Sequence, residues 1–385
     1  MSEVNLTTHR TSQSDAKLAA DELLQGLDGT KPKLATVFAN RNRDLPALVK
    51  SLRERLPKET RLVGATTGSA IDSMGFHNGE AVLALISGDL EVGIGLGKGL
   101  SDDALGAGTR ALQHASQELG KKESDLDPHR YVAMVVDDGF RYKKEELLLG
   151  VLDRNPTLTV VGGGASDNMM GPNPGADVII DDEIATDAVA VVLFRTDAPW
   201  AALRPHAYLP TGERLTFTKV DDATKRVIEI NGRPAAAEYA RLLGIGIDEL
   251  EFGKPHGFSL RPTALRVGRE YFMRSPHMPL PDGSIKLISH VTEGTELELM
   301  KMGDMVEMTK KFFTDDLPAR VKSPRAAILF NCGGRSWVAH SLGIQQAIGD
   351  TMKFAPPIVG LDVAGEIYNG FAIDTTLTVL AFGAN

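Results

Sequence analysis

Three stretches of this sequence repeat one pattern, and this repeat limits the possible folds more than any other feature does. Each stretch has a short apolar strand, an amphipathic helix, a second strand that runs into a glycine-rich turn, and a further strand. The first strands lie at 34–38, 131–136 and 326–330, and the helices at 44–55, 144–152 and 339–352. Because parallel neighbours in a sheet need helical crossovers, the repeat predicts mixed β-sheets flanked by helices.

The first and third copies are the most alike. The letters VFAN at 37–40 correspond to LFNC at 329–332, and VGATTG at 63–68 corresponds to VGLDVAG at 359–365, although such short strings also match by chance. We therefore expect an α/β protein with two related halves of mixed β-sheet flanked by helices, built from repeated strand-helix-strand units. A polar segment at 200–232 favours a boundary near residue 200, which gives two domains, 30–200 and 201–385.

Composition and charge exclude several classes of protein. The 385 residues are 42% hydrophobic and 24% charged, as in an ordinary globular protein. The net charge of −9, without a long Lys/Arg block, argues against nucleic acid as a partner. No apolar run has the length of a membrane helix or a secretory signal, so we expect no membrane insertion and a cytoplasmic location. The single cysteine, Cys332, excludes an intramolecular disulfide and zinc sites with several thiolates.

The sharpest local motif is Asn331-Cys-Gly-Gly-Arg335, at the end of a predicted strand and before a helix. In open α/β sheets, ligands bind outside the carboxyl ends of strands, where helix N-termini offer free N–H groups. Cys332, Gly333, Gly334 and Arg335 are therefore candidate ligand-binding residues, since an arginine can bind a carboxylate through two hydrogen bonds. The alternative is a plain turn with Arg335 in solvent.

Cys332 also raises the possibility of a catalytic thiol. Such a thiol needs a lowered pKa and a nearby base, and His340 is spaced too far along the helix to serve. No established local signature surrounds the cysteine. We therefore expect no enzyme and no catalytic residue, with a Cys332-dependent enzyme as the alternative.

Two further strand ends carry candidate binding residues. Gly163 and Asp167 lie in the turn of the second copy, and Gly365 and Glu366 lie in that of the third. If the strands of the third copy are neighbours, Arg335 can bind an acidic group while Glu366 binds an amine, which suits an amino-acid-like ligand. The alternative is that Arg335 and Glu366 pair with each other.

Glycines and histidines offer two weaker signals. The run at 93–99 lacks the spacing of a phosphate-binding loop and is better interpreted as a glycine-rich strand that lets a neighbouring backbone approach. The histidines form no metal-binding motif, so we assign no metal site. One axial histidine suffices for haem, however, and the candidates near strand ends or glycine-rich segments are His77, His256, His290 and His340.

These motifs together resemble the FIST family. The turn at 332–335, Gly365-Glu-Ile367 and the final strand at 376–382 resemble the C-terminal FIST domain. The VFAN strand, the letters VGATTGSAI from residue 63, GGGASDN at 162–168 and AVAVVLF at 188–194 resemble the N-terminal FIST domain. The resemblance covers about residues 30–383.

FIST domains are sensory, ligand-binding modules of bacterial signal transduction. The resemblance implies a small-molecule sensor that needs no cofactor and acts through a partner signalling enzyme, such as a histidine kinase or a cyclic-di-GMP enzyme. Some standalone members bind haem and sense nitric oxide, so the resemblance also implies haem as an alternative ligand. We add self-association into a homo-oligomer as a second route of output. By position, the resemblance points to Cys332, Gly334, Arg335, Gly365 and Glu366.

Overall fold

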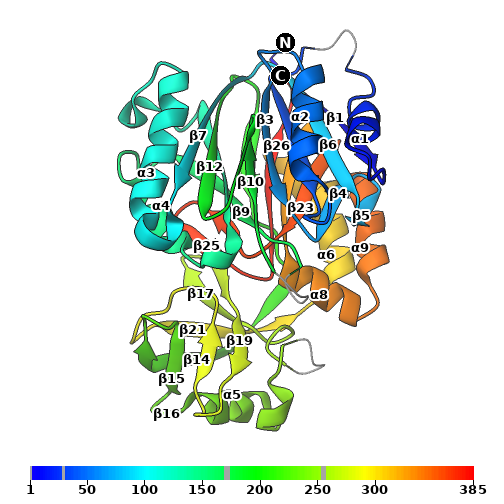
Figure 1. The fold of residues 1–385 in the computed structure, drawn as a ribbon. Helices are drawn as coiled ribbons and strands as arrows, with labels where there is room; N and C mark the ends of the chain where they lie inside the picture. The colour runs from blue at the N-terminus through cyan, green and yellow to red at the C-terminus, as the bar shows by residue number, and fades with distance from the viewer. Residues whose placement is uncertain (1, 28–30, 169–173, 253–256) are drawn as a thin grey trace.

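Two bodies of unequal size make up the molecule (Figure 1). The computed structural model describes residues 2–27, 31–168, 174–252 and 257–385. The larger body holds three six-stranded sheets with helices on their outer faces, and the smaller body holds a fourth sheet. Within the described ranges, no helix combines the length and the apolar character that a membrane crossing requires.

The larger body consists of three units of like order, as the three sequence copies predict. The first unit holds β1 (Val4–Thr11), α1 (Ala16–Leu23), β2 (Leu34–Ala39), α2 (Leu45–Arg55), β3 (Arg61–Thr66), β4 (Ser69–Asp72), β5 (Gly75–Asn78) and β6 (Ala81–Gly88). The second holds β7 (Glu91–Lys98), α3 (Leu100–Glu118), β8 (Tyr131–Asp138), α4 (Lys144–Leu152), β9 (Thr159–Ala165), β10 (Val178–Ile180), β11 (Glu183–Ala185) and β12 (Ala188–Arg195). The third holds β13 (Trp200–Leu203), α6 (Met305–Lys311), α7 (Leu317–Arg320), β22 (Ala326–Cys332), α8 (Gly333–Ser341), α9 (Gln345–Thr351), β23 (Ile358–Val363), β24 (Glu366–Tyr368), β25 (Phe371–Ile373) and β26 (Leu377–Phe382).

Residues 208–302 interrupt the third unit and form the smaller body, which we call the insertion. Its elements are β14 (Tyr208–Asp221), β15 (Arg226–Ile230), β16 (Arg233–Pro234), α5 (Ala235–Leu243), β17 (Thr263–Val267), β18 (Glu270–Arg274), β19 (Pro276–Pro279), β20 (Ile285–Leu287) and β21 (Glu296–Met302). It has an apolar core of its own around Phe217, Tyr239 and Phe258. The central core of the larger body draws no member from 208–302.

Each unit gives its short hairpin to the sheet of another unit. The hairpin β4–β5 of the first unit pairs with β23 of the third, β10–β11 of the second pairs with β3 of the first, and β24–β25 of the third pairs with β9 of the second. In each unit the two strands joined by the helical crossover are parallel, as the sequence predicts. The sheets are therefore mixed and helix-flanked, the expected α/β class is confirmed, and the three units are joined in a cyclic exchange.

Three glycines mark the same place in the three units. They are Gly64, Gly162 and Gly360, and a Cβ at each would lie 2.3, 1.9 and 2.6 Å from a backbone oxygen of the neighbouring parallel strand. Only glycine fits such a close approach. Each glycine is paired with an isoleucine of the incoming hairpin, namely Ile179, Ile367 and Ile71 in that order. This register makes residues of the three units directly comparable.

The structure corrects one predicted helix and explains the glycine-rich run. The helix expected at 339–352 is two helices, α8 and α9, because Gly343 takes a left-handed φ of 68° between them. The run at 93–99 is strand β7, as interpreted from the sequence. A Cβ at Gly95 would lie 2.0 Å from the carbonyl oxygen of Ala111, so α3 packs directly on the strand backbone.

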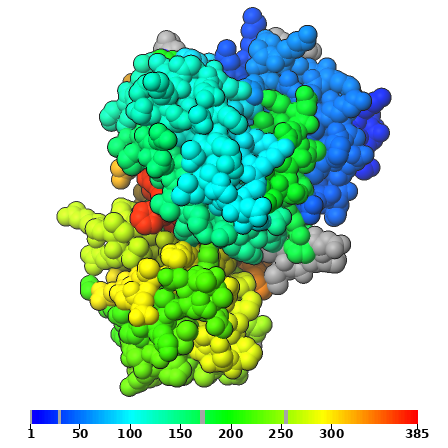
Figure 2. All heavy atoms as spheres, turned by 60° about the vertical axis from the view of Figure 1, so that its left-hand side comes forward, coloured from blue at the N-terminus to red at the C-terminus, as the bar shows by residue number. Residues whose placement is uncertain are grey.

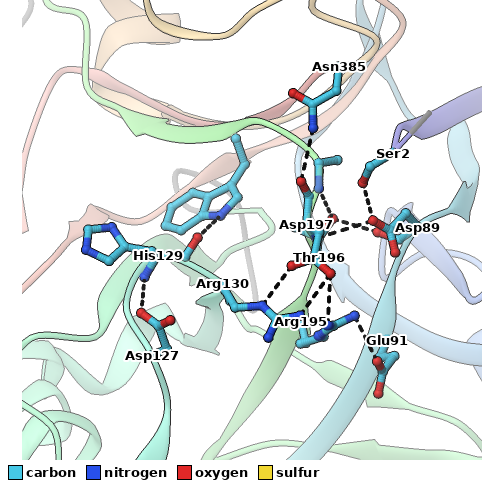
Figure 3. A network of polar contacts seen from close by, with 12 residues as sticks. Ser2, Asp89, Glu91, Asp127, His129, Arg130, Arg195, Thr196, Asp197 and Asn385 are labelled. Carbon is cyan, nitrogen blue, oxygen red and sulfur yellow. Dashed lines mark hydrogen bonds and ion pairs between the residues drawn. The ribbon is translucent and has the colours of Figure 1, made fainter.

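The two chain ends meet at the end of the larger body that is remote from the insertion (Figures 1 and 3). The Ser2 hydroxyl donates to Asp89, and the Asn385 amide donates to the carbonyl of Asp197 at 3.3 Å. Arg130 binds the carboxylate of Asp197 through two hydrogen bonds of 2.7 and 2.8 Å. The first and third units are thereby joined to the second at this end.

Candidate functional site

The carboxyl end of the third unit's strands carries a buried polar cluster. We define it as Cys332, Arg335, Asp362, Glu366, Asp374 and Thr375, all of which are buried. The second unit also buries polar groups at its strand end, but there Asp137 is paired with Lys144 at 3.0 Å. The register shows how unusual Glu366 is, because its place is taken by Ala70 in the first unit and by Val178 in the second. A charged group at a position that is otherwise apolar points to function rather than folding.

Glu366 lies at the start of β24 and is 0% exposed. Its Oε1 accepts hydrogen bonds from the backbone N–H of Thr376, at 2.8 Å, and from the Thr376 hydroxyl. Its Oε2 has no hydrogen-bond partner in the described part of the chain. Burial raises the pKa of Glu366 to about 8, and the Asp374 carboxylate acts in the same direction. The Cys332 thiol contacts this carboxyl group and lowers its pKa in part, and Oε2 is open to a stronger hydrogen-bond donor.

The turn that ends β25 is strained. Thr375 has φ of 56°, and it is the buried, β-branched member of the non-glycine residues with positive φ in the described ranges. The corresponding places hold Gly79 in the first unit and Asp187 in the second, also with positive φ. Glycine adopts this conformation without cost and threonine does not, and such strain concentrates at functional sites.

Cys332 braces this turn. The backbone N–H of Thr375 donates to the Cys332 thiol, just as the N–H of Asp187 donates to Asp138 at 2.9 Å in the second unit. Burial raises the pKa of Cys332 well above its usual value, and the Glu366 and Asp374 carboxylates raise it further. The thiol environment is therefore the opposite of the one that activates a nucleophile.

Arg335 lies in the first turn of α8 and is 4% exposed. Its guanidinium donates to Asn331 Oδ1 at 2.5 Å and to the Thr309 hydroxyl at 2.6 Å, and it forms no ion pair with any described residue. Asn331 in turn donates to Asp362 at 2.7 Å. Arg335 and Glu366 thus lie in one cluster without pairing directly. The Cys332 side chain, at the N-cap of α8, forms no capping hydrogen bond with this helix.

Asp362 lies at the same level of the sheet as Asn331, on the neighbouring parallel strand. Its carboxylate also accepts from Ser336 at 2.9 Å. Burial raises the pKa of Asp362 to about 7. Both carboxylates at this strand end therefore titrate near neutral pH.

The insertion covers this cluster. Ser289 donates to Asp374 at 2.5 Å, the hydroxyls of Ser275 and Thr375 lie 3.0 Å apart, and Arg274 donates to the carbonyl of Ala372. Figure 2 shows C-terminal residues, in red, at the junction between the insertion and the larger body. The site is closed from this side.

One narrow pocket reaches Arg335. It lies between the segment that precedes β14, including His206, and residues of α6, including Thr309. Its volume is about 10 Å³, about the space that one water molecule needs. This pocket is too small for a ligand larger than water.

The other predicted binding residues have different surroundings. Gly163 is paired with Glu366, and Gly365 has φ of 77°, which glycine adopts freely, so both support the cluster through the backbone. Gly333 and Gly334 form the first turn of α8. Asp167 instead accepts hydrogen bonds from the side chain of Asn40 and the backbone of Arg41, at the strand end of the first unit.

Sequence reasoning missed Asn331, Asp374, Thr375 and the two serines of the insertion. Asp362 could have been found, because it stands in VGLDVAG where the first copy has threonine. Glu366 also stands where the other units have a different kind of residue. This comparison requires the strand pairing of the exchanged hairpin, which the sequence does not show.

Three of the four histidines named as haem-ligand candidates lie in the described part of the chain. His290 and His340 are exposed, and the ring of His77 bonds to Asp72 at 2.7 Å, so none of the three is directed into an apolar pocket. The fourth candidate, His256, lies outside the described residues. Among the described side chains, no group of three or more His, Cys, Asp or Glu could hold a metal ion.

An α/β core of three strand-exchanging units, with a polar strand-end cluster covered by an insertion, thus describes the molecule. The family model of the FIST N domain matches residues 33–233, and that of the FIST C domain matches residues 235–369. The chain belongs to the FIST family.

Other comparisons are weak. No curated protein sequence matches this chain. Among solved structures, cyanuric acid hydrolase from A. caulinodans is similar over 99% of both chains with 10% identity and a TM-score of 0.36. PurLQS from Thermotoga maritima is similar over 100% of this chain and 74% of its own, with 11% identity and a TM-score of 0.20. Neither similarity is close enough to support a conclusion about activity.

Proposed function

We propose that this protein is a sensor of small molecules in bacterial signal transduction, and that the buried polar cluster binds its ligand. Membership of the FIST family supports the sensory role. The observation that carries the choice of site is the free Oε2 of Glu366, fully buried at a position that is apolar in both other units. An unpaired buried carboxyl oxygen is costly, and a ligand that donates to it recovers that cost.

The chemistry of the cluster favours a ligand with both an amine and an acidic group. A protonated amine complements Glu366 and Asp374, and a carboxylate complements Arg335 and the uncapped N-terminus of α8. Amino-acid-like molecules have this combination. The raised pKa of Cys332 favours binding over thiol chemistry, so we propose no catalytic role for it.

We further propose that a partner signalling enzyme receives the signal, in the manner of FIST sensors that act on histidine kinases or cyclic-di-GMP enzymes. Pull-down with a co-encoded kinase, with and without ligand, tests this step. Equal capture under both conditions contradicts it.

A thermal-shift screen against the twenty amino acids and related amines tests the ligand site. We expect one group of compounds to raise the melting temperature of the wild type, since a ligand that binds only the folded state stabilises it. The Glu366→Gln variant should lose this response, because an amide cannot lose a proton to become the carboxylate that pairs with a bound amine. The control Glu59→Gln, at an exposed position, should keep it. A response that survives Glu366→Gln, or no response from any compound, contradicts the proposal.

A further inference from the structure

The insertion joins the larger body through two chain crossings that lie side by side. The chain enters it after Ala207 and leaves it at Gly303, and the N–H of Gly303 donates to the carbonyl of Ala207 at 2.7 Å. Tyr208 and Met302, the first and last residues of the insertion, are paired across two antiparallel strands. The insertion is covalently attached to the larger body only at these two adjacent points. This is the geometry of a hinge.

Beyond these crossings, the insertion contacts the larger body through separate polar and apolar contacts. Lys225 donates to the carbonyl of Tyr142 at 2.8 Å and lies 3.4 Å from the carboxylate of Glu145. The N–H of His290 donates to the same carboxylate at 2.7 Å. Two aromatic contacts join the bodies: Phe252 with Trp337 and Phe272 with Phe371, with ring centres 5.1 and 4.3 Å apart. The buried members of the insertion's apolar core all come from the insertion, and Trp337 of α8 packs against them from outside. Opening therefore separates Trp337 from this core while the buried core itself stays intact.

One short turn connects the insertion to the ligand-binding carboxylate. The carboxylate of Asp374 accepts a hydrogen bond from the hydroxyl of Ser289, which belongs to the insertion. The hydroxyl of Thr375 is hydrogen-bonded to that of Ser275, also in the insertion. The next residue, Thr376, holds Oε1 of Glu366 through its N–H and its hydroxyl. The strained φ of Thr375 lies between these two sets of contacts. A change at Glu366 is therefore transmitted to the insertion through three consecutive residues.

The pocket that reaches Arg335 is smaller than the proposed ligand, so movement of the insertion is one way to admit it. A cavity of about 10 Å³ admits one water molecule, whereas the proposed ligand is several times larger. We propose that the insertion is a lid that rotates about the crossings at Ala207 and Gly303, and that the turn 374–376 is a latch through which the occupancy of Glu366 sets the lid position. This inference rests on the proposed function and adds its conformational output.

The single native cysteine provides the measurement. Cys332 is 6% exposed and lies beneath the lid, so its reaction with dithiobis-nitrobenzoate in native buffer reports opening. Lys225→Met removes contacts between the lid and the larger body. The matched control is Lys286→Met, since Lys286 bonds within the insertion to the carbonyl of Thr224. Ser289→Ala, which removes a latch contact, is the second test variant.

We expect Lys225→Met and Ser289→Ala each to speed the labelling of Cys332 by about 3- to 10-fold, since each removes hydrogen bonds present only in the closed state. Lys286→Met should label at the wild-type rate. Low concentrations of urea should hardly change the wild-type rate, because local opening exposes little surface. The lid is refuted if all four proteins label at one rate, or if labelling has the full urea dependence of global unfolding.

Addition of each compound from the thermal-shift screen separates this inference from the proposed function. Slower labelling in the presence of a binding compound supports both. Fast local labelling that no compound slows contradicts the ligand site and leaves the lid standing. Labelling only through global unfolding contradicts the lid even when a compound binds.

Discussion

At the scale of single residues, the molecule concentrates its unfavourable features in one place. Glu366, Asp362 and Arg335 are charged groups removed from water, and Thr375 has a conformation that suits glycine. Each costs free energy of folding. The equivalents of Glu366 in the first two units are alanine and valine, and those of Thr375 are glycine and aspartate. The second unit buries Asp137 as well, but pairs it with Lys144. The cost of burying Glu366 agrees with the binding role proposed above.

The raised pKa of Glu366 predicts how stability depends on pH. The folded state holds the proton up to about pH 8, whereas the unfolded chain releases it near its ordinary pKa of 4.5. The native state therefore binds more protons between these values, and stability falls as pH rises from about 5 to 8. The slope from this group reaches at most about 1.4 kcal/mol per pH unit.

Urea unfolding of the wild type and Glu366→Gln at pH 5, 6, 7 and 8 measures this effect. Other titratable groups of the cluster also contribute to the pH dependence: Asp362, Asp374 and Cys332 have raised pKa values, and Arg335 is a cation. The contribution of Glu366 is therefore the difference in unfolding free energy between the wild type and the variant at each pH. We expect the stability of the variant to vary less with pH. Parallel curves would show that Glu366 is ionised throughout this range.

At the scale of elements, the contact between β7 and α3 depends on small residues. Gly93, Gly95 and Gly97 face the carbonyls of Ala115, Ala111 and Ala107, and a Cβ at any of them would lie 2.0 or 2.1 Å from an oxygen. Backbone thus packs on backbone, and neither element can move aside because α3 is also packed against α4. This is the physical reason for the glycine-rich run.

Gly95→Ala should therefore destabilise the protein by about 3 kcal/mol, because the added methyl forces α3 away from the strand. The control is Gly68→Ala, where the nearest atom to a new Cβ is 3.9 Å away and φ is not positive. That variant should stay within about 0.5 kcal/mol of the wild type. The midpoints of urea unfolding of the two variants measure this difference in stability. Equal midpoints would contradict the close packing of α3 on β7.

Strands and helices were largely predictable because their signals are local. The helix at 144–152 has its predicted bounds, and apolar runs located β2, β8 and β22 to within two residues. The exchange of hairpins was not predictable, since strands of three or four residues such as β24 carry no information about a partner in another unit. The motif around Cys332 and Arg335 pointed to a strand end that is indeed polar and buried. Its partners Ser275 and Ser289 come from a different body, so no spacing in the sequence relates them to it.

At the scale of the whole molecule, the insertion is an addition to a central core that has no member from it. The carbonyl of Ala207 and the N–H of Gly303 are already hydrogen-bonded, so a short loop can join them. The central core contains no residue from 208–302. The three exchanged sheets therefore do not depend on the insertion for their apolar packing.

Replacing residues 208–302 by a four-residue Gly/Ser loop should leave a cooperatively folding protein with a helical circular dichroism signal. Cys332 should then react with thiol reagents at the rate of an exposed cysteine, since its cover is gone. Failure of this shortened chain to unfold cooperatively would show that the insertion is part of the core.

The cyclic exchange of hairpins has a consequence for the chain while it is still being made. The β4–β5 hairpin emerges early from the ribosome, yet its partner strand, β23, begins only at Ile358. Synthesis proceeds at about 5–20 residues per second, so this edge waits many seconds without its neighbour. Unpaired edges invite association with other chains. Nascent chains of this protein are thus natural clients of chaperones, and a message truncated before codon 358 yields a product that cannot close its ring of sheets.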